Sequence, residues 1–253
     1  MTSPVLAGAE PFSAAGGRDG VLVLHGFTGS PYSVRGLAVA FADAGFAVEL
    51  PLLPGHGTSV SDLATTTWAD WSATAESAYV DLSGRCRQVV VAGLSMGALL
   101  ATWLAARHPA VAGLVLVNPF MEPVADSFRD LVRGLLDAGI HEVPAIGSDI
   151  ARPGVTELAY DETPIQPALS LFDAVDDVVV RLPEVRCPVL LFSSVEDHVA
   201  PPAGSDRLAA AVSGPLERVM LTRSYHVATL DYDREEIETR AVAFAREVTE
   251  RRD

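Results

Sequence analysis

The sequence predicts an α/β fold, a mostly parallel central sheet with helices on both faces. Short apolar runs, often β-branched, alternate along the chain with longer amphipathic runs of helical spacing. The 253 residues, 49% of them hydrophobic, are enough for one large core. Neither an internal repeat nor a low-complexity segment divides the chain. We therefore expect a single domain over residues 1–253.

Each expected element follows from its own pattern. The strands are short apolar runs bounded by turn-forming residues, predicted at residues 21–24, 46–50, 88–92, 111–117, 189–192 and 218–221. The helices are longer runs with apolar residues on one face, predicted at residues 33–44, 67–82, 98–107, 124–138, 168–182 and 234–251. Gly45 and Gly139 follow two of these helices and are typical stop signals.

The alternation is interrupted between residues 120 and 183, where we see no strand signal. An amphipathic helix at 124–138 is followed by an irregular stretch, 141–167, rich in proline, glycine and acidic residues. A long insertion after a sheet strand is either a lid over a site or a disordered linker. Its apolar content favours a packed helical cap, at about residues 120–183, and helices that only extend the core are the alternative.

The charge of the chain excludes several functions. The net charge is −15, and all 18 basic residues are arginines. Such a chain repels a phosphate backbone, so we expect no nucleic-acid partner. Without lysine there is neither a lysine Schiff base nor a P-loop. Cys86 and Cys187 form no metal-binding spacing with the histidines, so we expect two thiols and no metal site.

The stretch G-L-S-M-G, residues 93–97, is the most informative in the chain. It stands between an apolar strand and a helix-forming run. A serine on such a strand-to-helix turn sits at a strained backbone position with its hydroxyl exposed above the sheet edge. Gly93 and Gly97 fit because strand and helix approach too closely there for side chains. Ser95 is therefore the candidate nucleophile.

A serine hydroxyl needs a base to take its proton and an anion to orient that base. On this architecture the acid and then the histidine follow the serine along the chain. His226, in a loop after the strand at 218–221, is the favoured base, and His198 is the alternative. Asp197, in the loop after the strand at 189–192, is the favoured acid, and Glu196 is its rival.

Backbone N–H groups must also stabilise the oxyanion that forms on the substrate. We expect one from Met96, which follows the nucleophile, and one from Phe27, in the loop after the first strand. Gly26 lets the backbone approach the substrate there, and His25 packs or hydrogen-bonds beneath the loop. The side chains of Phe27 and Met96 are expected to line the substrate pocket.

Taken together, these motifs resemble the α/β-hydrolase superfamily, in particular its bacterial carboxylesterase and monoacylglycerol lipase group. The matching stretches cover nearly the whole chain from residue 21 and are H-G-F-T-G-S-P (25–31), L-P-G-H-G (53–57), G-L-S-M-G (93–97), E-D-H-V (196–199) and S-Y-H-V-A-T-L-D (224–231). The resemblance implies a serine esterase or lipase of lipid metabolism with Ser95, Asp197 and His226 as its triad. It also implies a lid carboxylate that recognises glycerol hydroxyls, a position that Glu157 matches.

The expected reaction is hydrolysis of a carboxylic ester through an acyl-enzyme, without a cofactor. Because burying each methylene contributes about 0.8 kcal/mol, an apolar lid favours monoacylglycerols or medium-chain esters. Thioesterases, acyltransferases and other chemistries of the same fold use the same triad and remain alternatives. A hydrolase scaffold that serves as a small-molecule receptor is an alternative of another class.

Location and partners follow from what the sequence lacks. Apolar runs stop far short of the roughly 20 residues of a membrane-spanning helix, and residues 1–20 show no secretory signal. We therefore expect a cytoplasmic protein with a small-molecule ester substrate. An exposed apolar rim on the lid would allow transient contact with lipid or pairing with a second subunit, and both alternatives stay open.

Overall fold

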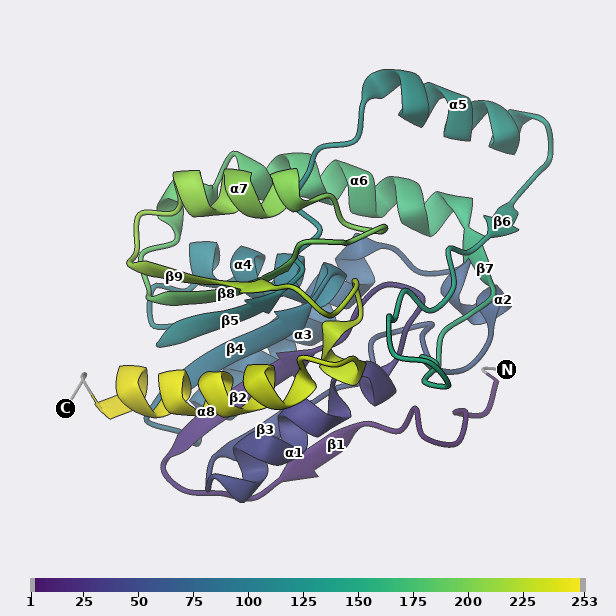
Figure 1. The fold of residues 1–253 in the computed structure, drawn as a ribbon. Coiled ribbons are helices and arrows are strands. Elements are labelled where there is room, and N and C mark those ends of the chain that lie inside the picture. Colours follow the sequence, from purple (N-terminus) through teal and green to yellow (C-terminus); the bar gives the residue numbers. More distant parts are fainter. Residues whose placement is uncertain (1–2, 251–253) are drawn as a thin grey trace.

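The computed structural model describes residues 3–250 and has a seven-stranded sheet between two helical layers (Figure 1). The strand order is β1-β3-β2-β4-β5-β8-β9. The edge strand β1 pairs antiparallel with β3, and the other neighbours pair in parallel. The strands are β1 (Phe12–Ala14), β2 (Asp19–Leu24), β3 (Ala47–Leu50), β4 (Gln88–Leu94), β5 (Gly113–Val117), β8 (Val189–Ser194) and β9 (Leu216–Leu221).

Helices cover both faces of this sheet, as the sequence predicts (Figure 1). α1 and α8 lie on one face, and α3, α4, α6 and α7 lie on the other. The α-helices are α1 (Arg35–Asp43), α2 (Val60–Leu63), α3 (Trp68–Ser83), α4 (Met96–Arg107), α5 (Asp126–Asp137), α6 (Ile165–Val179), α7 (Pro202–Ala211) and α8 (Arg234–Glu250). Short 3-10 turns are η1 (Pro31–Val34), η2 (Leu182–Glu184) and η3 (Ala228–Leu230).

The sheet separates two apolar cores by simple alternation along each strand. In β2, Leu22 and Leu24 pack into the core beneath α3, α4 and α6, whereas Val21 and Val23 pack against α1 and α8. Because both faces of a parallel sheet are buried, its strands are continuous apolar runs. This is why the six strands predicted from apolar runs are all present.

The structure also contains elements that the sequence pattern did not predict. β1, α2 and α7 are new, and α6 begins at Ile165. The expectation of no strand between residues 120 and 183 is wrong. β6 (Glu142–Pro144) and β7 (Glu162–Pro164) form a small antiparallel pair there. Each has three residues, too few for a two-residue alternation to be recognised.

Residues 120–183, which we call the inserted segment, leave the sheet after β5 and return to it at β8. Its second helix, α6, packs on α3 and α4 and contributes Leu171, Val175 and Val178 to the core. Its first helix, α5, lies farther out, above α6 (Figure 1). The inserted segment therefore has an inner helix that belongs to the core and an outer part, at α5, that contributes no side chain to it.

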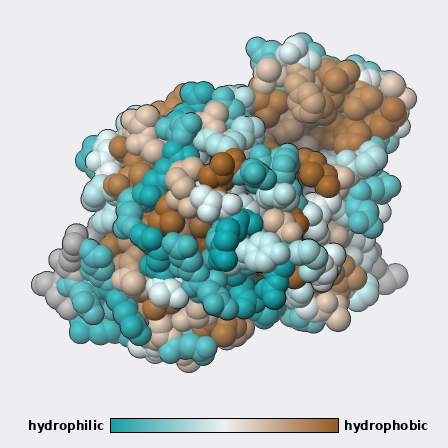
Figure 2. Space-filling model, in the orientation of Figure 1, coloured by the Kyte–Doolittle hydropathy of each residue, from teal (hydrophilic) through white to brown (hydrophobic). Residues whose placement is uncertain are grey.

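The apolar side of α5 is not packed in the way its pattern predicts. The buried residue of this helix is Arg129, which forms ion pairs of 2.7 Å with Asp173 and Asp176 on α6. Phe128 is 50% exposed and Leu131 is 63% exposed. In Figure 2 this part of the molecule is an apolar, brown area at the upper right. The helix is thus attached to α6 by these ion pairs and by a ring contact between Phe128 and Phe172, with centroids 6.3 Å apart, and leaves much of its apolar side exposed.

Two findings concern the membrane and cysteine expectations. Within residues 3–250, no helix combines the length and the apolar character needed to cross a membrane. The same residues contain no disulfide: Cys187 is buried and Cys86 is half-buried, both as thiols.

The turn between β4 and α4 is held by the close approach of two backbones. A Cβ atom on Gly97 would lie 2.1 Å from the carbonyl oxygen of Leu24, and one on Gly93 would lie 2.2 Å from that of Gly97. Real Cβ contacts are never so short, so both positions require glycine. Between them Ser95 has φ 56° and ψ −116°, a strained conformation for a residue with a side chain. The predicted strand-turn-helix geometry is therefore present.

We expect Gly97→Ala to lower the free energy of unfolding by about 3 kcal/mol, because the new methyl group must push β2 and α4 apart. Gly134→Ala is the matched control. Gly134 also lies in a helix, but nothing lies within 4 Å of its added Cβ. That variant should be as stable as the parent or gain up to about 1 kcal/mol. Urea unfolding of the three proteins measures both effects, and equal stability of the Gly97 variant and the parent would contradict the packing argument.

Candidate active site

The predicted site residues lie together at one edge of the sheet. Ser95 directly follows β4, Asp197 follows β8, and His226 follows β9. These strands are parallel, so their carboxyl ends meet at the same edge. Ser95 and His226 both line a cavity of about 440 Å³. The fold thus brings side chains separated by more than a hundred residues to one place.

His226 and Asp197 form a buried pair. The Nδ1 atom of His226 lies 2.8 Å from Oδ2 of Asp197, and the two side chains are 7% and 2% exposed. The other carboxylate oxygen of Asp197 accepts the backbone N–H groups of Val199 and Ala200 at 2.9 and 2.7 Å. The carboxylate is therefore fixed on one side and holds the imidazole on the other. Nε2 is the ring nitrogen that this contact leaves available, and His226 lines the same cavity as Ser95.

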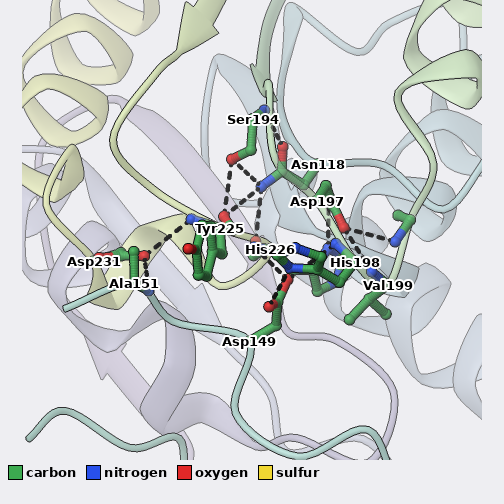
Figure 3. A network of polar contacts seen from close by, with 11 residues as sticks. Asn118, Asp149, Ala151, Ser194, Asp197, His198, Val199, Tyr225, His226 and Asp231 are labelled. Carbon is green, nitrogen blue, oxygen red and sulfur yellow. Dashed lines mark hydrogen bonds and ion pairs between the residues drawn. The ribbon is translucent and has the colours of Figure 1, made fainter. Parts of the chain in front are cut away.

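The two rivals do not take these places. Glu196 is exposed, and the imidazole of His198 contacts Asp149 instead of Asp197, with Nδ1 2.8 Å from Oδ1 (Figure 3). This hydrogen bond to Asp149, together with the charge of that carboxylate, raises the pKa of His198 above its ordinary value. Asp197 accepts the N–H groups of Val199 and Ala200 in its own loop, whereas the ring of His198 is directed to Asp149.

Sequence reasoning missed Asn118, a buried residue directly after β5 with φ 44°. Its amide group donates to the carbonyl oxygen of His226 at 2.7 Å and to the hydroxyl of Ser194 at 2.9 Å. Its Oδ1 accepts the N–H of Ser194 at 2.7 Å. Asn118 thus ties the loop of His226 to the end of β8 (Figure 3). The signal in the sequence was a polar residue directly after an entirely apolar strand.

The residues expected to supply the oxyanion donors lie in the loop after β2 and at the start of α4. Met96 is the first residue of α4, and the first N–H groups of a helix have no partner within it. Gly26 and Phe27 line the cavity beside Ser95. The side chain of Met96, however, is fully buried in the core and does not line the cavity, which corrects that expectation. It points away because a helix directs side chains outward while its N–H groups point along the axis.

His25 lies directly beneath this loop. Its Nε2 accepts the N–H of Leu53 at 3.1 Å, so Nδ1 carries the proton and donates to the carbonyl oxygen of Gly26 at 2.9 Å. That carbonyl belongs to the same peptide group as the N–H of Phe27. The imidazole therefore fixes the plane of the peptide whose N–H is the expected donor.

His25 and its neighbour His56 are both fully buried, with ring centroids 5.0 Å apart. Burial lowers the pKa of His25 to about 4. Burial, and then the neighbouring His25, also lowers the pKa of His56 well below its ordinary value. Both imidazoles are therefore neutral near pH 7.

Glu157 belongs to the inserted segment and reaches the same cavity. Its carboxylate accepts a hydrogen bond from the hydroxyl of Ser33. Burial raises the pKa of this carboxyl, and the Ser33 hydroxyl and the charge of His226 act in the opposite direction. The rest of the cavity wall is mostly apolar and includes Phe27, Leu94, Phe120, Val124, Phe128, Ile146, Leu171, Phe172, Val199 and Val227. Glu157 and Glu122 are therefore two carboxylates in a mostly apolar cavity wall that also includes Ser95.

The family model of the alpha/beta hydrolase family matches residues 21–239. The chain belongs to this family. The match begins at β2 and ends within α8, so it includes all the site residues discussed above.

Relatives of this alpha/beta hydrolase are lipases and esterases. A thermostable monoacylglycerol lipase of Bacillus sp. (strain H-257) is 44% identical over 246 residues, 95% of this chain and 96% of the relative. A carboxylesterase of Bacillus subtilis (strain 168) is 25% identical over 229 residues, 89% of this chain and 92% of the relative. One solved structure comes from work on the metagenome-derived lipolytic enzymes LipS and LipT and is 42% identical, with a TM-score of 0.92. The match covers 96% of this chain and 100% of the chain in that structure. The chain is therefore a carboxylic ester hydrolase.

The buried histidines make the stability of the hydrolase depend on pH. Below about pH 6.5, His25 and His56 bind protons in the unfolded chain, whereas their lowered pKa values keep them neutral in the folded protein. Stability should therefore fall as the pH falls from about 6.5 towards the folded pKa values, by up to about 1.4 kcal/mol per pH unit for each histidine. His56→Phe should make the fall of stability with decreasing pH less steep, because one of the two contributing histidines is removed. Urea unfolding at several pH values measures the slope, with His141→Gln, at an exposed histidine, as the control. Identical slopes for His56→Phe and the parent would refute the assignment.

Proposed function

We propose that the hydrolase cleaves its ester by a serine mechanism in which Ser95, His226 and Asp197 form the catalytic triad. The observation that carries this proposal is the buried 2.8 Å contact between His226 and Asp197 at the edge of the cavity that Ser95 lines. In this mechanism Nε2 of His226 takes the proton of the Ser95 hydroxyl as the oxygen attacks the ester carbonyl. Asp197 orients the imidazole and stabilises its charged form.

The oxyanion of the tetrahedral intermediate is stabilised by the N–H groups of Phe27 and Met96. Removing one such donor typically costs about 3 to 4 kcal/mol of transition-state stabilisation. His226 then gives its proton to the departing alcohol, which leaves the acyl group on Ser95. A water molecule attacks this acyl-enzyme while His226 takes its proton, and the carboxylic acid is released as the proton returns to Ser95.

The substrate we propose is a monoacylglycerol or a medium-chain carboxylic ester. The 440 Å³ cavity with its apolar wall supports this, since each buried methylene of an acyl chain contributes about 0.8 kcal/mol. Glu157 supports the glycerol part, because a carboxylate can accept hydrogen bonds from two hydroxyl groups. The 44% identical relative, a monoacylglycerol lipase, points the same way.

We further propose that the outer part of the inserted segment acts as the lid of this cavity and meets lipid. Val124 and Phe128 line the cavity, and Phe128 and Leu131 are also exposed on α5. Phe128 thus belongs both to the cavity wall and to the exposed apolar side of α5, so apolar side chains lead from the cavity to the outer surface. This arrangement suits a substrate that arrives from a lipid assembly instead of from water.

The nucleophile is tested with a fluorophosphonate probe, which reacts with activated serines. The parent enzyme should be labelled, and Ser95→Ala should not be labelled. Ser95→Ala should also keep at most about a thousandth of the parent's ester hydrolysis rate. Ser193→Ala, at a buried serine in β8, is a control that should be labelled like the parent. Equal labelling of the parent and of the Ser95 variant would remove Ser95 as the nucleophile.

The role of Glu157 is tested by comparing two substrates with the same acyl chain. Glu157→Gln should lower kcat/KM for a monoacylglycerol by about tenfold or more, because hydrogen bonds to a charged group contribute about 1.5 to 3 kcal/mol. It should change kcat/KM for the matching p-nitrophenyl ester by less than about twofold. Glu122→Gln, at a second cavity carboxylate that pairs with Arg207 at 3.2 Å, is the control. An equal loss on both substrates would contradict glycerol recognition.

A further inference from the structure

Asp149, in the irregular part of the inserted segment, contacts the loops of both proposed triad partners of Ser95. One oxygen, Oδ2, accepts the backbone N–H of His226 at 3.0 Å and that of His198 at 3.2 Å. The other, Oδ1, lies 2.8 Å from Nδ1 of His198. The backbone carbonyl of Asp149 accepts the N–H of Val227 at 3.0 Å. Asp149 therefore holds His226, the proposed base, by the backbone N–H of His226. It holds Asp197, the proposed acid, through the neighbouring residue His198.

A second carboxylate makes the same kind of contact in the opposite direction. Asp231, which follows His226 in the chain and is 1% exposed, accepts the N–H groups of Ala151 and Arg152 at 2.7 and 3.0 Å. It also accepts the N–H of Tyr225 at 3.0 Å. Asp149 thus binds the loop of His226, and Asp231, from that loop, binds the residues after Asp149 (Figure 3).

The hydrogen bonds to Asp149 are expected to be strong because their acceptor is a mostly buried carboxylate. The side chain of Asp149 is 10% exposed, and hydrogen bonds from N–H groups to a carboxylate in such a site are roughly twice as strong as neutral ones. The ring of His198 also packs edge-on against Tyr225, with centroids 4.8 Å apart. The loops of Asp197 and His226 are therefore joined at two points besides the direct contact of the two side chains.

We propose that Asp149 is a positioning residue for the reaction: it sets the distance and orientation between His226 and Asp197 from the inserted segment. Asp149 does not touch the cavity, so it acts on the chemistry through His226 and not through the substrate. The inserted segment then has a role in assembling the catalytic groups in addition to covering them. This inference rests on the proposed triad.

The test compares Asp149→Ala with Asp149→Asn. An asparagine can reproduce the contacts, since its oxygen can accept the two N–H groups and its amide can donate to Nδ1 of His198. Alanine makes none of them. We expect Asp149→Ala to lower kcat for p-nitrophenyl butyrate by about 10- to 100-fold, with KM within about twofold, because small misplacements of a base have effects of this size. Asp149→Asn should keep kcat within about threefold of the parent.

Two further variants complete the comparison. Asp161→Ala, at an exposed carboxylate of the same segment outside the cavity, should leave kcat unchanged. His198→Ala should have a smaller effect than Asp149→Ala, since the contact between Asp149 and the N–H of His226 remains. If Asp149→Ala does not fold, Asp149→Glu takes its place: it keeps the charge but moves both oxygens, and the same loss of kcat is expected.

Proton NMR of the enzyme without substrate gives a readout that a merely stabilising role would not change. The proton between Nδ1 of His226 and Asp197 should give a low-field resonance in the parent and in Asp149→Asn. It should be shifted or lost by exchange in Asp149→Ala at a temperature where the protein is fully folded. An unchanged resonance with an unchanged kcat in Asp149→Ala would overturn the proposal. So would an asparagine variant as impaired as the alanine variant.

Ser95→Ala separates this proposal from the proposed function. It should lose hydrolysis but keep the low-field resonance. If Ser95→Ala instead remains active, the serine mechanism is wrong, whereas the resonance in the Asp149 variants still reports on whether Asp149 positions the imidazole.

Discussion

The site depends on one close contact between backbones, where the start of α4 passes over the end of β2. Gly97 lies so near the carbonyl of Leu24 that no side chain fits, and Gly93 lies equally near Gly97. This contact leaves Ser95 no ordinary backbone conformation, and the residue takes φ 56°. The loop that holds Phe27 is close to the same turn, since a Cβ on Gly26 would lie 3.5 Å from Cβ of Ser95. The position of Ser95 and that of the loop after β2 are therefore set together.

Much of this was predictable because it is encoded locally. A glycine on either side of Ser95, a strand before it and a helix after it are visible within ten residues of sequence. The places of Asp197 and His226 followed from chain order and from the rule that sites lie at the carboxyl ends of parallel strands. The sheet could be predicted because buried parallel strands are continuous apolar runs, whatever lies around them.

The rest depends on contacts between distant residues, for which a single sequence carries little signal. Asn118 and Asp149 are polar residues in irregular segments, and what they bind lies 108 and 77 residues away at His226. The outward apolar side of α5 is a similar case. Its spacing predicts a buried face, but the buried side chain is Arg129, whose guanidinium pairs with Asp173 and Asp176 on α6. Helical periodicity predicts which residues share one face of a helix. It does not predict which face another helix or strand will pack against.

The inserted segment is joined to two of the loops that line the cavity. Residues 149–152 contact the loop of His226, and residues 157–160 contact the loop after β2, where Ser30 donates to the carbonyl of Leu158 and Tyr160 donates to that of Thr28. A chimera that exchanged this segment between two hydrolases for a new specificity would also replace these attachments. Recombination between homologues should therefore succeed only where the incoming segment carries donors and acceptors that match the recipient's loops, so that the exchangeable unit is the inserted segment together with these loops.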